Sequence, residues 1–540
     1  MKIWFLTFES KDTKKVGGLA EVPPRLGEAL KKMGYEVEII VPNHGFIQGY
    51  RGDGLVRLYS FKTLYGDLEV YMYTKPSVKH IIISGSVLDE LEIYSPKYLM
   101  DKVKVWALGI KHYYEVLEER RRPDIIHGND WLSVPSLVLL RSIDKSLRLY
   151  YQIHLLSKTY FSLEDVTYDL GLDPSNKIYG LYGLKSIREY YELSNGYADR
   201  LGGLLSNKLL TVSKNYVREV VRRTGFDLED HVDYIPNATT WRLDDILEKL
   251  KTIHPEIKQY LSIDSIIGYD RINIRKYLLL KALRDLGKNE PIVDDRGFRE
   301  FLEKLDIPPF TGKGRVEGFN EDGPLVIMTG RVSRQKGIHV LLRAFEDIVS
   351  ILPEIKVLLL LLPVWSDLSL INDIVEHSIL FRENLRVIFG RAPSIYGLAH
   401  IASNTMVAPS IYEPFGLIAL ESMVCGSPVV ASYTGGLAET VVDIRRYGVI
   451  GTGLHITPSD CFELAHGLTD MVLFMETLYY KPWSREWIRL VERIDNRVLR
   501  ELLISNPRAP LLVRKSCMKR ADQYSWDNSA KKALLIYGGK

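Results

Sequence analysis

Residues 3–42, "IWFLTFESKDTKKVGGLAEVPPRLGEALKKMGYEVEIIVP", contain the pattern that decides the fold. Residues 3–8 are almost wholly apolar, which predicts a buried strand, and residues 37–42 predict a second one. Between these strands, after a loop with two glycines, apolar side chains keep the spacing of one helix face, and Gly34 ends the helix. That helix face is formed by Leu19, Val22, Leu26, Leu30 and Met33. A strand, a helix and a second strand in this order are typical of a parallel sheet covered by helices.

The same alternation continues through two parts of the chain. The further predicted strands are 124–127, 149–154 and 209–212 in the first part, and 325–330, 357–365, 405–410 and 427–432 in the second. Ser213 is the predicted N-cap of the helix that follows the first part's last strand. Two such parts predict an α/β protein with two doubly wound, Rossmann-like domains. Ligands of such domains bind in a crevice beyond the carboxyl ends of the strands.

The length of the chain agrees with more than one domain. It has 540 residues, 46% of them hydrophobic, and single cores rarely exceed ~250–300 residues. We predict an N-terminal domain at 1–225, a C-terminal domain at 226–518, and a C-terminal helix at 519–540 that returns to the N-terminal domain. Two charged stretches, about 240–320 and 475–505, predict helical additions, which serve either surface packing or an oligomer contact.

The composition excludes several classes of function. A formal net charge of +3 is too small to indicate a partner made of nucleic acid. The N-terminal apolar run is too short for a signal peptide, and no run approaches the ~20 apolar residues that span a bilayer. Cys425, Cys461 and Cys517 lie far apart without metal-ligand spacing, which predicts reduced, buried thiols. We therefore expect a soluble cytoplasmic protein.

The stretch "APSIYEPFGLIALESM", residues 408–423, carries two glutamates, Glu413 and Glu421. If Pro414 opens a helix, eight residues of rise separate the carboxylates by ~12 Å. Paired carboxylates that cleave a glycosidic bond lie ~5–9.5 Å apart, so the two glutamates are predicted to touch different parts of one long ligand. The first N–H groups of such a helix suit phosphate. These groups belong to Phe415, Gly416 and Leu417.

Two other loops between a strand and a helix also attract anions. "TGRVSRQKGIHVLL", residues 329–342, places Arg331 and Lys336 after a predicted strand. "TKKVGGLAEV", residues 13–22, places Lys15 before Gly17 and Gly18, although it lacks the full glycine pattern of a dinucleotide-binding loop. Three such loops from both domains predict a diphosphate ligand that is neutralised without a metal. Taken alone, Arg331 and Lys336 would be ordinary surface charge, the two-glycine loop would be a weak signal, and the stretch at 408–423 would be a capped helix start with a surface glutamate.

Taken together, the sequence motifs of the chain resemble those of the glycogen/starch synthases, most closely their archaeal form. The matching motifs run in the family's order and cover nearly the whole chain: 15–22, 41–49, 123–131, 151–154, 211–220, 235–237, 330–337, 413–421, 434–441 and 519–526. The resemblance implies the GT-B fold, in which two Rossmann-like domains face each other across a cleft. It makes 1–225 the acceptor side and 226–518 the nucleotide-sugar side.

The resemblance also implies roles for individual residues. The residues implied in catalysis are His154, Arg331, Lys336 and Glu413. The residues implied in binding the nucleotide sugar are Lys15, Gly17, Gly18, Asp130, Asn237, Phe415, Gly416, Leu417 and Glu421. Arg331 and Lys336 would stabilise the departing diphosphate, and Glu413 would hold the glucose hydroxyls. No metal and no other cofactor is implied. Asp130 could instead cap the next helix.

The implied reaction transfers glucose from ADP-glucose or UDP-glucose to the non-reducing end of an α-1,4-glucan, with retention of configuration. Three positions depart from the family pattern. Asn129 stands where a second histidine is usual, Ala238 replaces a glycine, and "PVWSD" at 363–367 replaces a glycine-containing turn. The last change leaves the base contact open, with Arg391 and Tyr396 in the right region. The acceptor's length and a possible homo-oligomer also stay open.

Two other functions remain compatible with these residues. Another retaining GT-B transferase, which makes a small glycoside such as trehalose or sucrose, would share Arg331, Lys336, Glu413 and Glu421. A non-catalytic glucan-binding protein with the same fold is the other alternative, and the departures at 129, 238 and 363–367 keep it open. The loop at 15–18 and "TGGLAETV" at 434–441 favour the glucan synthase.

Overall fold

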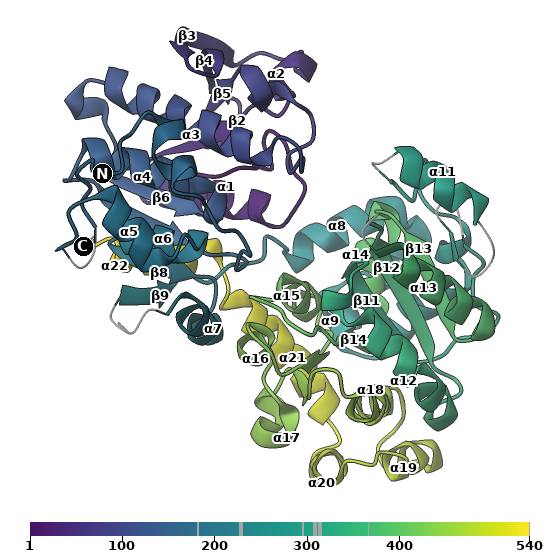
Figure 1. Cartoon of the computed structure of the whole chain (residues 1–540). Coiled ribbons are helices and arrows are strands. Elements are labelled where there is room, and N and C mark those ends of the chain that lie inside the picture. Colours follow the sequence, from purple (N-terminus) through teal and green to yellow (C-terminus); the bar gives the residue numbers. More distant parts are fainter. Residues whose placement is uncertain are drawn as a thin grey trace. The chain divides into compact units, whose positions relative to one another are not determined.

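The computed structural model describes residues 1–180, 183–225, 231–293, 296–305, 310–311, 316–364 and 367–538. The chain forms two compact units (Figure 1), and each is described by itself. The first unit is Met1–Asn237 with Trp526–Lys540, and the second is Ala238–Ser525. The sequence placed the two boundaries at 225/226 and 518/519, earlier in the chain than these units divide.

A nine-stranded sheet forms the centre of the first unit, with the order β3-β4-β5-β2-β1-β6-β7-β8-β9. Its strands are β1 Lys2–Leu6, β2 Glu36–Pro42, β3 Leu55–Thr63, β4 Gly66–Tyr73, β5 Lys79–Ser84, β6 Ile125–Asn129, β7 Arg148–Gln152, β8 Lys208–Thr211 and β9 Val232–Tyr234. Strands β5 to β9 of this order pair in parallel, as predicted, whereas β3–β4 and β4–β5 are antiparallel. The sheet is therefore parallel as predicted over most of its width, with an antiparallel edge that the sequence analysis did not identify. The edge strand β3 is largely exposed, so it lacks the continuous apolar run that marks a buried parallel strand.

Helices cover both faces of this sheet. They are α1 Val22–Lys32, α2 Phe46–Gly49, α3 Leu99–Val116, α4 Val134–Ile143, α5 Ile187–Ser194, α6 Ala198–Leu205, α7 Lys214–Thr224 and α22 Trp526–Ile536. Ser213 caps α7 as predicted, because its hydroxyl accepts a hydrogen bond from the Tyr216 backbone N–H at 3.3 Å. The last helix, α22, packs on α1 and buries Ala530 and Ala533 in the core of the first unit.

A seven-stranded sheet of parallel pairs forms the centre of the second unit, with the order β10-β13-β12-β11-β14-β15-β16. Its strands are β10 Phe310–Thr311, β11 Leu325–Arg331, β12 Lys356–Leu362, β13 Leu385–Phe389, β14 Thr405–Ala408, β15 Val429–Ser432 and β16 Gly453–Ile456. β10 lies inside the stretch 240–320, for which only helices were predicted. A strand of two residues is too short to leave a pattern in the sequence.

The remaining helices of the second unit are α8 Leu243–Ile253, α9 Ile263–Ile267, α10 Arg271–Leu280, α11 Arg296–Lys304, α12 Ile338–Ile351, α13 Leu368–Leu380, α14 Pro393–Ala402, α15 Leu417–Val424, α16 Leu437–Thr440, α17 Ile444–Tyr447, α18 Cys461–Glu476, α19 Arg485–Glu492, α20 Arg497–Ser505 and α21 Ala509–Asp522. In the described residues, helices α8 to α11 lie in the stretch 240–320 with β10, and α19 and α20 lie in 475–505; residues 294–295, 306–309 and 312–315 of the first stretch lie outside the described residues. Buried charge anchors the first of these stretches, because Arg275 of α10 pairs with Asp322 at 2.8 Å and with Glu476 of α18 at 2.7 Å.

In each sheet the order of the strands reverses at a central strand. In the first unit β1 pairs with both β2 and β6, and in the second unit β11 pairs with both β12 and β14. Ligands of doubly wound domains bind beyond the carboxyl ends of the strands at such a point. The loops after β1, β6 and β7, and those after β11, β14 and β15, are therefore where a functional site is expected.

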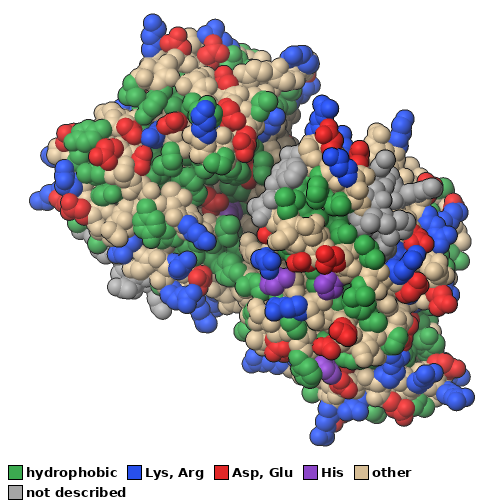
Figure 2. Space-filling model, turned by 45° about the vertical axis from the view of Figure 1, so that its right-hand side comes forward, with side chains coloured by type: hydrophobic (Ala, Val, Ile, Leu, Met, Phe, Trp, Pro, Cys, Tyr) green, Lys and Arg blue, Asp and Glu red, His purple; other side chains and the backbone are tan. Residues whose placement is uncertain are grey.

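The surface of both units carries charges of both signs. Figure 2 shows Lys and Arg side chains interspersed with Asp and Glu side chains on the face that it draws, which agrees with a net charge of +3. In the described part of the chain, no helix has the length and apolar character needed to cross a bilayer. All three cysteines are free thiols, but only Cys425 and Cys517 are buried; Cys461 is half-buried, contrary to the prediction.

Buried histidines make the stability of the first unit dependent on pH. Burial lowers the pKa of His44 and His127 to about 3 and that of His80 to about 4. These values lie below the ~6.5 of an unfolded chain, so the stability is fully present above that pH and is lost as the pH falls through ~6.5 toward ~4. Each histidine can contribute up to about 1.4 kcal/mol per pH unit.

We expect the unfolding temperature to be lower at about pH 5 than at about pH 7. Thermal unfolding of the protein at a series of pH values measures this difference. His127→Gln should make this decline shallower, because one fewer side chain takes up a proton on unfolding. If the unfolding temperature of this variant falls with pH as steeply as that of the wild-type protein, His127 does not contribute to the pH dependence.

Candidate functional site

The loops after β11 and β14 bring two of the predicted catalytic residues together. Lys336 lies in a short 3-10 turn, Arg334–Lys336, and its Nζ is 2.5 Å from Oε2 of Glu413. The backbones of the two loops are also joined, because the Ile411 N–H donates to the Gln335 carbonyl at 2.9 Å. A cation and a carboxylate are thereby fixed side by side at the switch point of the second unit.

Arg331 is the last residue of β11 and its side chain is exposed. Within the described ranges of the chain, no acidic side chain forms an ion pair with it. Gly330 precedes it with φ +145, and a β-carbon there would lie 4.0 Å from Cε of Lys336. Arg331 thus lies at the carboxyl end of β11, five residues before Lys336, with an exposed side chain.

The helix at the two glutamates begins later than predicted. α15 begins at Leu417, and its N-cap is Gly416 with φ 90, so Pro414 does not open it. The separation of ~12 Å predicted for Glu413 and Glu421 rested on the earlier start and does not apply. Phe415 and Gly416 belong to the loop before the helix, and only Leu417 of the three predicted N–H donors lies in its first turn.

Glu421 lies one turn inside α15 and contacts the region predicted for the base. Its Oε2 accepts a hydrogen bond from the Tyr396 hydroxyl of α14 at 3.1 Å. Burial, followed by the charge of Glu421, raises the pKa of Tyr396 well above its ordinary value. Part of the substituted turn at 363–367, residues 365 and 366, lies outside the described residues.

Glycines allow the loops of the second unit to touch one another. A β-carbon at Gly337 would lie well inside 3.0 Å of the Pro409 carbonyl oxygen, and one at Gly435 would collide in the same way with the Glu413 carbonyl oxygen. Gly436 is equally close to the backbone of Phe415. The loops after β11, β14 and β15 therefore meet backbone to backbone around Glu413.

In the first unit, the loop after β1 is held by a carboxylate that the sequence did not single out. Glu9 is 2% exposed and accepts hydrogen bonds from the backbone N–H groups of Val16 at 2.6 Å and Gly17 at 2.8 Å. Its other oxygen accepts from the Tyr94 hydroxyl at 2.9 Å. A β-carbon at Gly18 would meet nothing within 4 Å, so there is open space beside the loop at this glycine.

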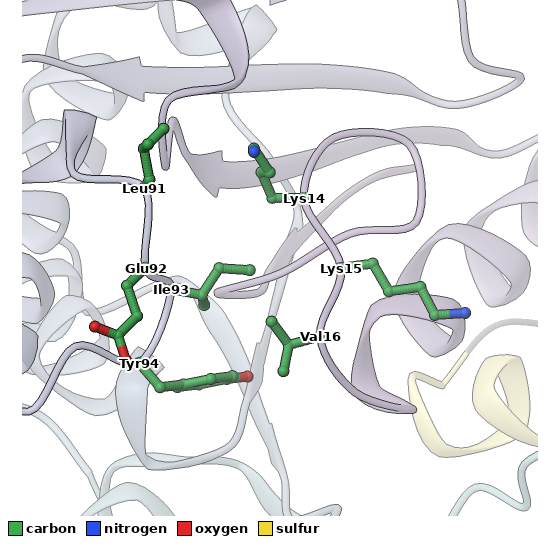
Figure 3. A pocket seen from close by; sticks show the side chains of 7 residues that line it. All are labelled: Lys14, Lys15, Val16, Leu91, Glu92, Ile93 and Tyr94. Carbon is green, nitrogen blue, oxygen red and sulfur yellow. The ribbon is translucent and has the colours of Figure 1, made fainter. Parts of the chain in front are cut away.

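Lys15 is engaged within the same loop region. Its Nζ is 2.6 Å from Oε1 of Glu21. Burial opposes ionisation of Glu21, but the hydrogen bond and charge of Lys15, with Arg25 and Lys11, lower the pKa of Glu21 below its ordinary value. Figure 3 shows the Lys15 side chain pointing away from the segment at Leu91–Tyr94. A cavity of about 310 Å³ lies beside this loop, lined by Lys14, Lys15, Val16, Leu91, Glu92, Ile93 and Tyr94.

Asp130 follows β6 and connects two strand ends. It has φ 54, and its Oδ1 accepts from the His154 backbone N–H at 2.7 Å and from the Leu155 N–H at 3.4 Å. It makes no side-chain cap to the turn Trp131–Ser133, so the capping alternative was wrong. Burial raises the pKa of Asp130 to about 8, and the two N–H groups oppose that rise.

His154 follows β7 and contacts the neighbouring strand end through its ring. Its Nε2 lies 2.9 Å from Oδ1 of Asn129, and burial lowers its pKa to about 3. His154 and Asp130 are brought together as predicted, because the His154 backbone N–H donates to Oδ1 of Asp130. Asn237 ends the chain segment of the first unit, and its buried Oδ1 has no hydrogen-bond partner in the part of the chain that the structure describes.

A second buried acid, Asp199 of α6, also fixes the loop that carries His154. Its Oδ2 accepts from the Ser157 backbone N–H at 2.7 Å and from the Tyr197 hydroxyl at 3.1 Å, and its Oδ1 from the Tyr151 hydroxyl at 2.5 Å. Burial raises the pKa of Asp199. In the sequence, Asp199 occupies the first turn of an ordinary helix, which gave no signal for this contact.

Asp199→Asn should lower kcat about 10- to 100-fold, because His154 would lose its fixed position. The matched control is Asp470→Asn, which replaces another buried aspartate that accepts two backbone N–H groups, at 2.7 and 3.0 Å, elsewhere in the fold. Steady-state kinetics and thermal unfolding of both variants separate the two effects. Equal losses of kcat in the two variants would show that Asp199 acts only on stability.

Residues that bind a metal were not predicted, and the described ranges contain no group of three or more His, Cys, Asp or Glu placed to hold one. The candidate site is therefore described by two sets of strand-end loops, one in each unit. Glu9, Asp199 and Asn129 support the loops. Most of the predicted residues lie on these loops, whereas Glu421 lies inside α15 and Asn237 follows β9.

Two family models match successive parts of this chain. A model of the starch synthase catalytic domain matches residues 2–234, and a model of glycosyl transferases group 1 matches residues 313–473. Among curated proteins, the glycogen synthase of Geotalea daltonii is 26% identical over 470 residues, covering 82% of this chain and 86% of its own length. The glycogen synthase of Acholeplasma laidlawii is 24% identical over 523 residues, covering 91% and 94%.

Solved structures show the same fold. The catalytic domain of starch synthase IV from Arabidopsis thaliana, bound to ADP and acarbose, matches with a TM-score of 0.64 at 18% identity, covering 99% of this chain and 98% of that one. A sucrose-phosphate synthase from Thermosynechococcus elongatus matches with a TM-score of 0.55 at 16% identity, covering 99% and 98%. With one sheet that is mostly parallel and one sheet of parallel pairs, these matches make the fold GT-B. The chain thus resembles starch synthases in its first part, glycosyl transferases group 1 in its second part and curated glycogen synthases over most of its length, and it is a hexosyltransferase.

Proposed function

We propose that the protein transfers glucose from ADP-glucose or UDP-glucose to the non-reducing end of an α-1,4-glucan, with retention of configuration. The observation that carries this proposal is the Lys336–Glu413 pair, held at 2.5 Å at the switch point of the second unit, where Arg331 ends β11. Such a place suits a ligand that carries both a diphosphate and a sugar. The solved relative from Arabidopsis thaliana was bound to ADP and acarbose, a nucleotide diphosphate and a sugar.

The basic residues of the second unit supply the electrostatic part of this mechanism. As the bond between the anomeric carbon and the diphosphate breaks, negative charge grows on the departing phosphate oxygens. Lys336 and Arg331, with the N–H of Leu417 at the start of α15, would meet that charge. Preorganised donors of this kind are worth about 3–4 kcal/mol each.

Retention follows if the new bond forms on the face that the diphosphate leaves. The acceptor hydroxyl then attacks the anomeric carbon from that face and gives its proton to a departing phosphate oxygen. Glu413 would hold hydroxyls of the transferred glucose. Glu421 and Tyr396, whose side chains share a hydrogen bond at 3.1 Å, would contact the nucleoside. Lys15, Gly17 and Gly18, with Asp130, His154 and Asn237, form the part contributed by the first unit. No metal takes part in this proposal.

Release of nucleotide diphosphate tests the function directly. The protein is incubated with ADP-glucose or UDP-glucose in the presence of glycogen, and in parallel with glucose 6-phosphate or fructose 6-phosphate as acceptors. We expect release that depends on glycogen, with elongated glucan as the product. Release with the small acceptors only would favour the synthase of a small glycoside, and binding of glycogen without release would favour a non-catalytic protein.

Three finer statements stay predictions. The two relatives named above are bacterial, and the closer likeness to the archaeal form rests on the sequence motifs alone. The cytoplasmic location and the homo-oligomer rest on composition and on the charged helices at 475–505. Light scattering of the purified protein tests the oligomer.

A further inference from the structure

The amide of Asn129 has a fixed orientation beside His154. Asn129 is 1% exposed, and its Nδ2 donates hydrogen bonds to the backbone carbonyls of Leu6 at 3.0 Å and His127 at 3.3 Å. Carbonyl oxygens only accept, so the nitrogen of the amide must face them. The amide oxygen, Oδ1, is therefore the atom that lies 2.9 Å from Nε2 of His154.

This orientation decides which nitrogen of the His154 ring carries the proton. An amide oxygen has no proton to give, so Nε2 must be the donor in the hydrogen bond. A neutral imidazole with its proton on Nε2 has a lone pair on Nδ1. The Nδ1 atom of His154 is buried and has no hydrogen-bond partner among the residues that the structure describes.

We propose that Asn129 holds His154 in the Nε2–H tautomer, so that Nδ1 accepts a hydrogen bond from a neutral hydroxyl of the bound sugar and does not contact a phosphate oxygen. The identity of the sugar rests on the proposed function. A phosphate oxygen needs a hydrogen-bond donor, and the only proton of this ring is already given to Asn129. Burial keeps the ring neutral, since it lowers the pKa of His154 to about 3.

Asn129 is one of the positions at which this chain departs from its family, where a second histidine is usual. An imidazole at that position could either donate to or accept from His154, depending on its own tautomer. An asparagine with both N–H groups engaged by carbonyls can only accept. In this chain, therefore, the residue at 129 determines the hydrogen-bonding character of His154.

The tautomer can be measured without any substrate. In protein labelled with ¹⁵N-histidine, the ¹⁵N chemical shifts of the 12 histidine rings show which nitrogen of each ring is protonated. The His154 signals are assigned by their loss in His154→Gln. We expect the wild-type ring to be protonated at Nε2 and Asn129→Leu to show a mixture of tautomers. Protonation at Nδ1 in the wild-type protein would overturn the proposal.

A matched control shows whether loss of any buried amide has the same effect. Asn43 is 0% exposed and its Nδ2 also donates to neighbouring groups of the first unit, at 2.7 Å to Asp89 and 2.9 Å to Gln48. Asn43→Leu should leave the tautomer of His154 unchanged. The same mixture in this variant would show that Asn129 does not set the tautomer by direct contact.

Kinetics identify the group that His154 contacts. Asn129→Leu should lower kcat/KM about tenfold with the complete nucleotide sugar, the effect of weakening one hydrogen bond in a buried site. The same comparison is made with nucleotide sugars that each lack one glucose hydroxyl. For the one that lacks the hydroxyl contacted by His154, Asn129→Leu should cause no further loss of kcat/KM relative to the wild-type protein. The dissociation constants of free ADP and UDP should stay the same in wild type and variant. Weaker binding of ADP or UDP would mean that His154 contacts phosphate. A lack of glucosyl transfer in the wild-type protein would overturn the proposed function and leave the tautomer measurement standing.

Discussion

Lys336→Ala should lower kcat for glucosyl transfer to glycogen about 10²–10³-fold, with ADP-glucose and with UDP-glucose alike. Lys336 carries a positive charge that Glu413 holds in place at 2.5 Å in the free protein. The charge that it would stabilise grows on the diphosphate only as the bond to glucose breaks. Its loss should therefore appear mainly in kcat, because the interaction strengthens in the transition state.

The matched control for this prediction is Arg334→Ala. Arg334 lies in the same short turn and carries the same charge, but its side chain is exposed. Initial rates of nucleotide diphosphate release from both variants should differ by at least an order of magnitude. If both variants keep the wild-type rate, the role of Lys336 in stabilising the departing group is wrong. If both lose it equally, the effect is one of overall charge.

The strand ends of the second unit illustrate what the sequence could predict. A continuous apolar run followed by a loop and an amphipathic helix identifies a buried parallel strand, and functional residues gather at the carboxyl ends of such strands. Lys336 and Glu413 were placed at two strand ends by this rule, and the structure brings them into contact. The contact is predictable because β11 and β14 are neighbours at the switch point.

The start of α15 shows where the local pattern misleads. Proline commonly occupies the first position of a helix, which placed the start at Pro414. The structure instead places Gly416, with φ 90, before the first helical residue. Contacts with the loop after β15 decide this conformation, because Gly435 and Gly436 bring that loop against the backbone of Glu413 and Phe415. A contact between loops that are distant in the sequence leaves no periodic pattern of residue types from which it could be predicted.

The supporting acids were missed for a different reason. Glu9 and Asp199 each accept hydrogen bonds from backbone N–H groups of a functional loop, at distances of 2.6 to 2.8 Å. In the sequence they are single charged residues at a strand end and in a first helical turn, where such residues are common on surfaces. Their burial depends on how the loops fold over them, which a pattern of residue types does not contain.

Gly435→Ala should lower kcat about 100-fold without unfolding the protein, because it would displace the loop that carries Glu413. A β-carbon at position 435 would lie well inside 3.0 Å of the Glu413 carbonyl oxygen, and this neighbour is backbone that cannot rotate away. The two loops must then separate by a substantial fraction of an ångström or more. A displacement of about 1 Å in a catalytic group can cost about 10²-fold in rate.

The matched control for this substitution is Gly171→Ala in the first unit. Gly171 has φ +70 and Gly435 has φ +44, so both variants place alanine in the left-handed region, which costs about 1–2 kcal/mol. A β-carbon at Gly171 meets nothing within 4 Å, so the backbone strain is present there without the collision. We expect both variants to fold, with a larger decrease in unfolding temperature in Gly435→Ala because of the added collision, and a loss of kcat in Gly435→Ala alone. Normal turnover by Gly435→Ala would mean that the position of Glu413 is not critical, and the assignment of Glu413 to the transferred glucose would then fail with it.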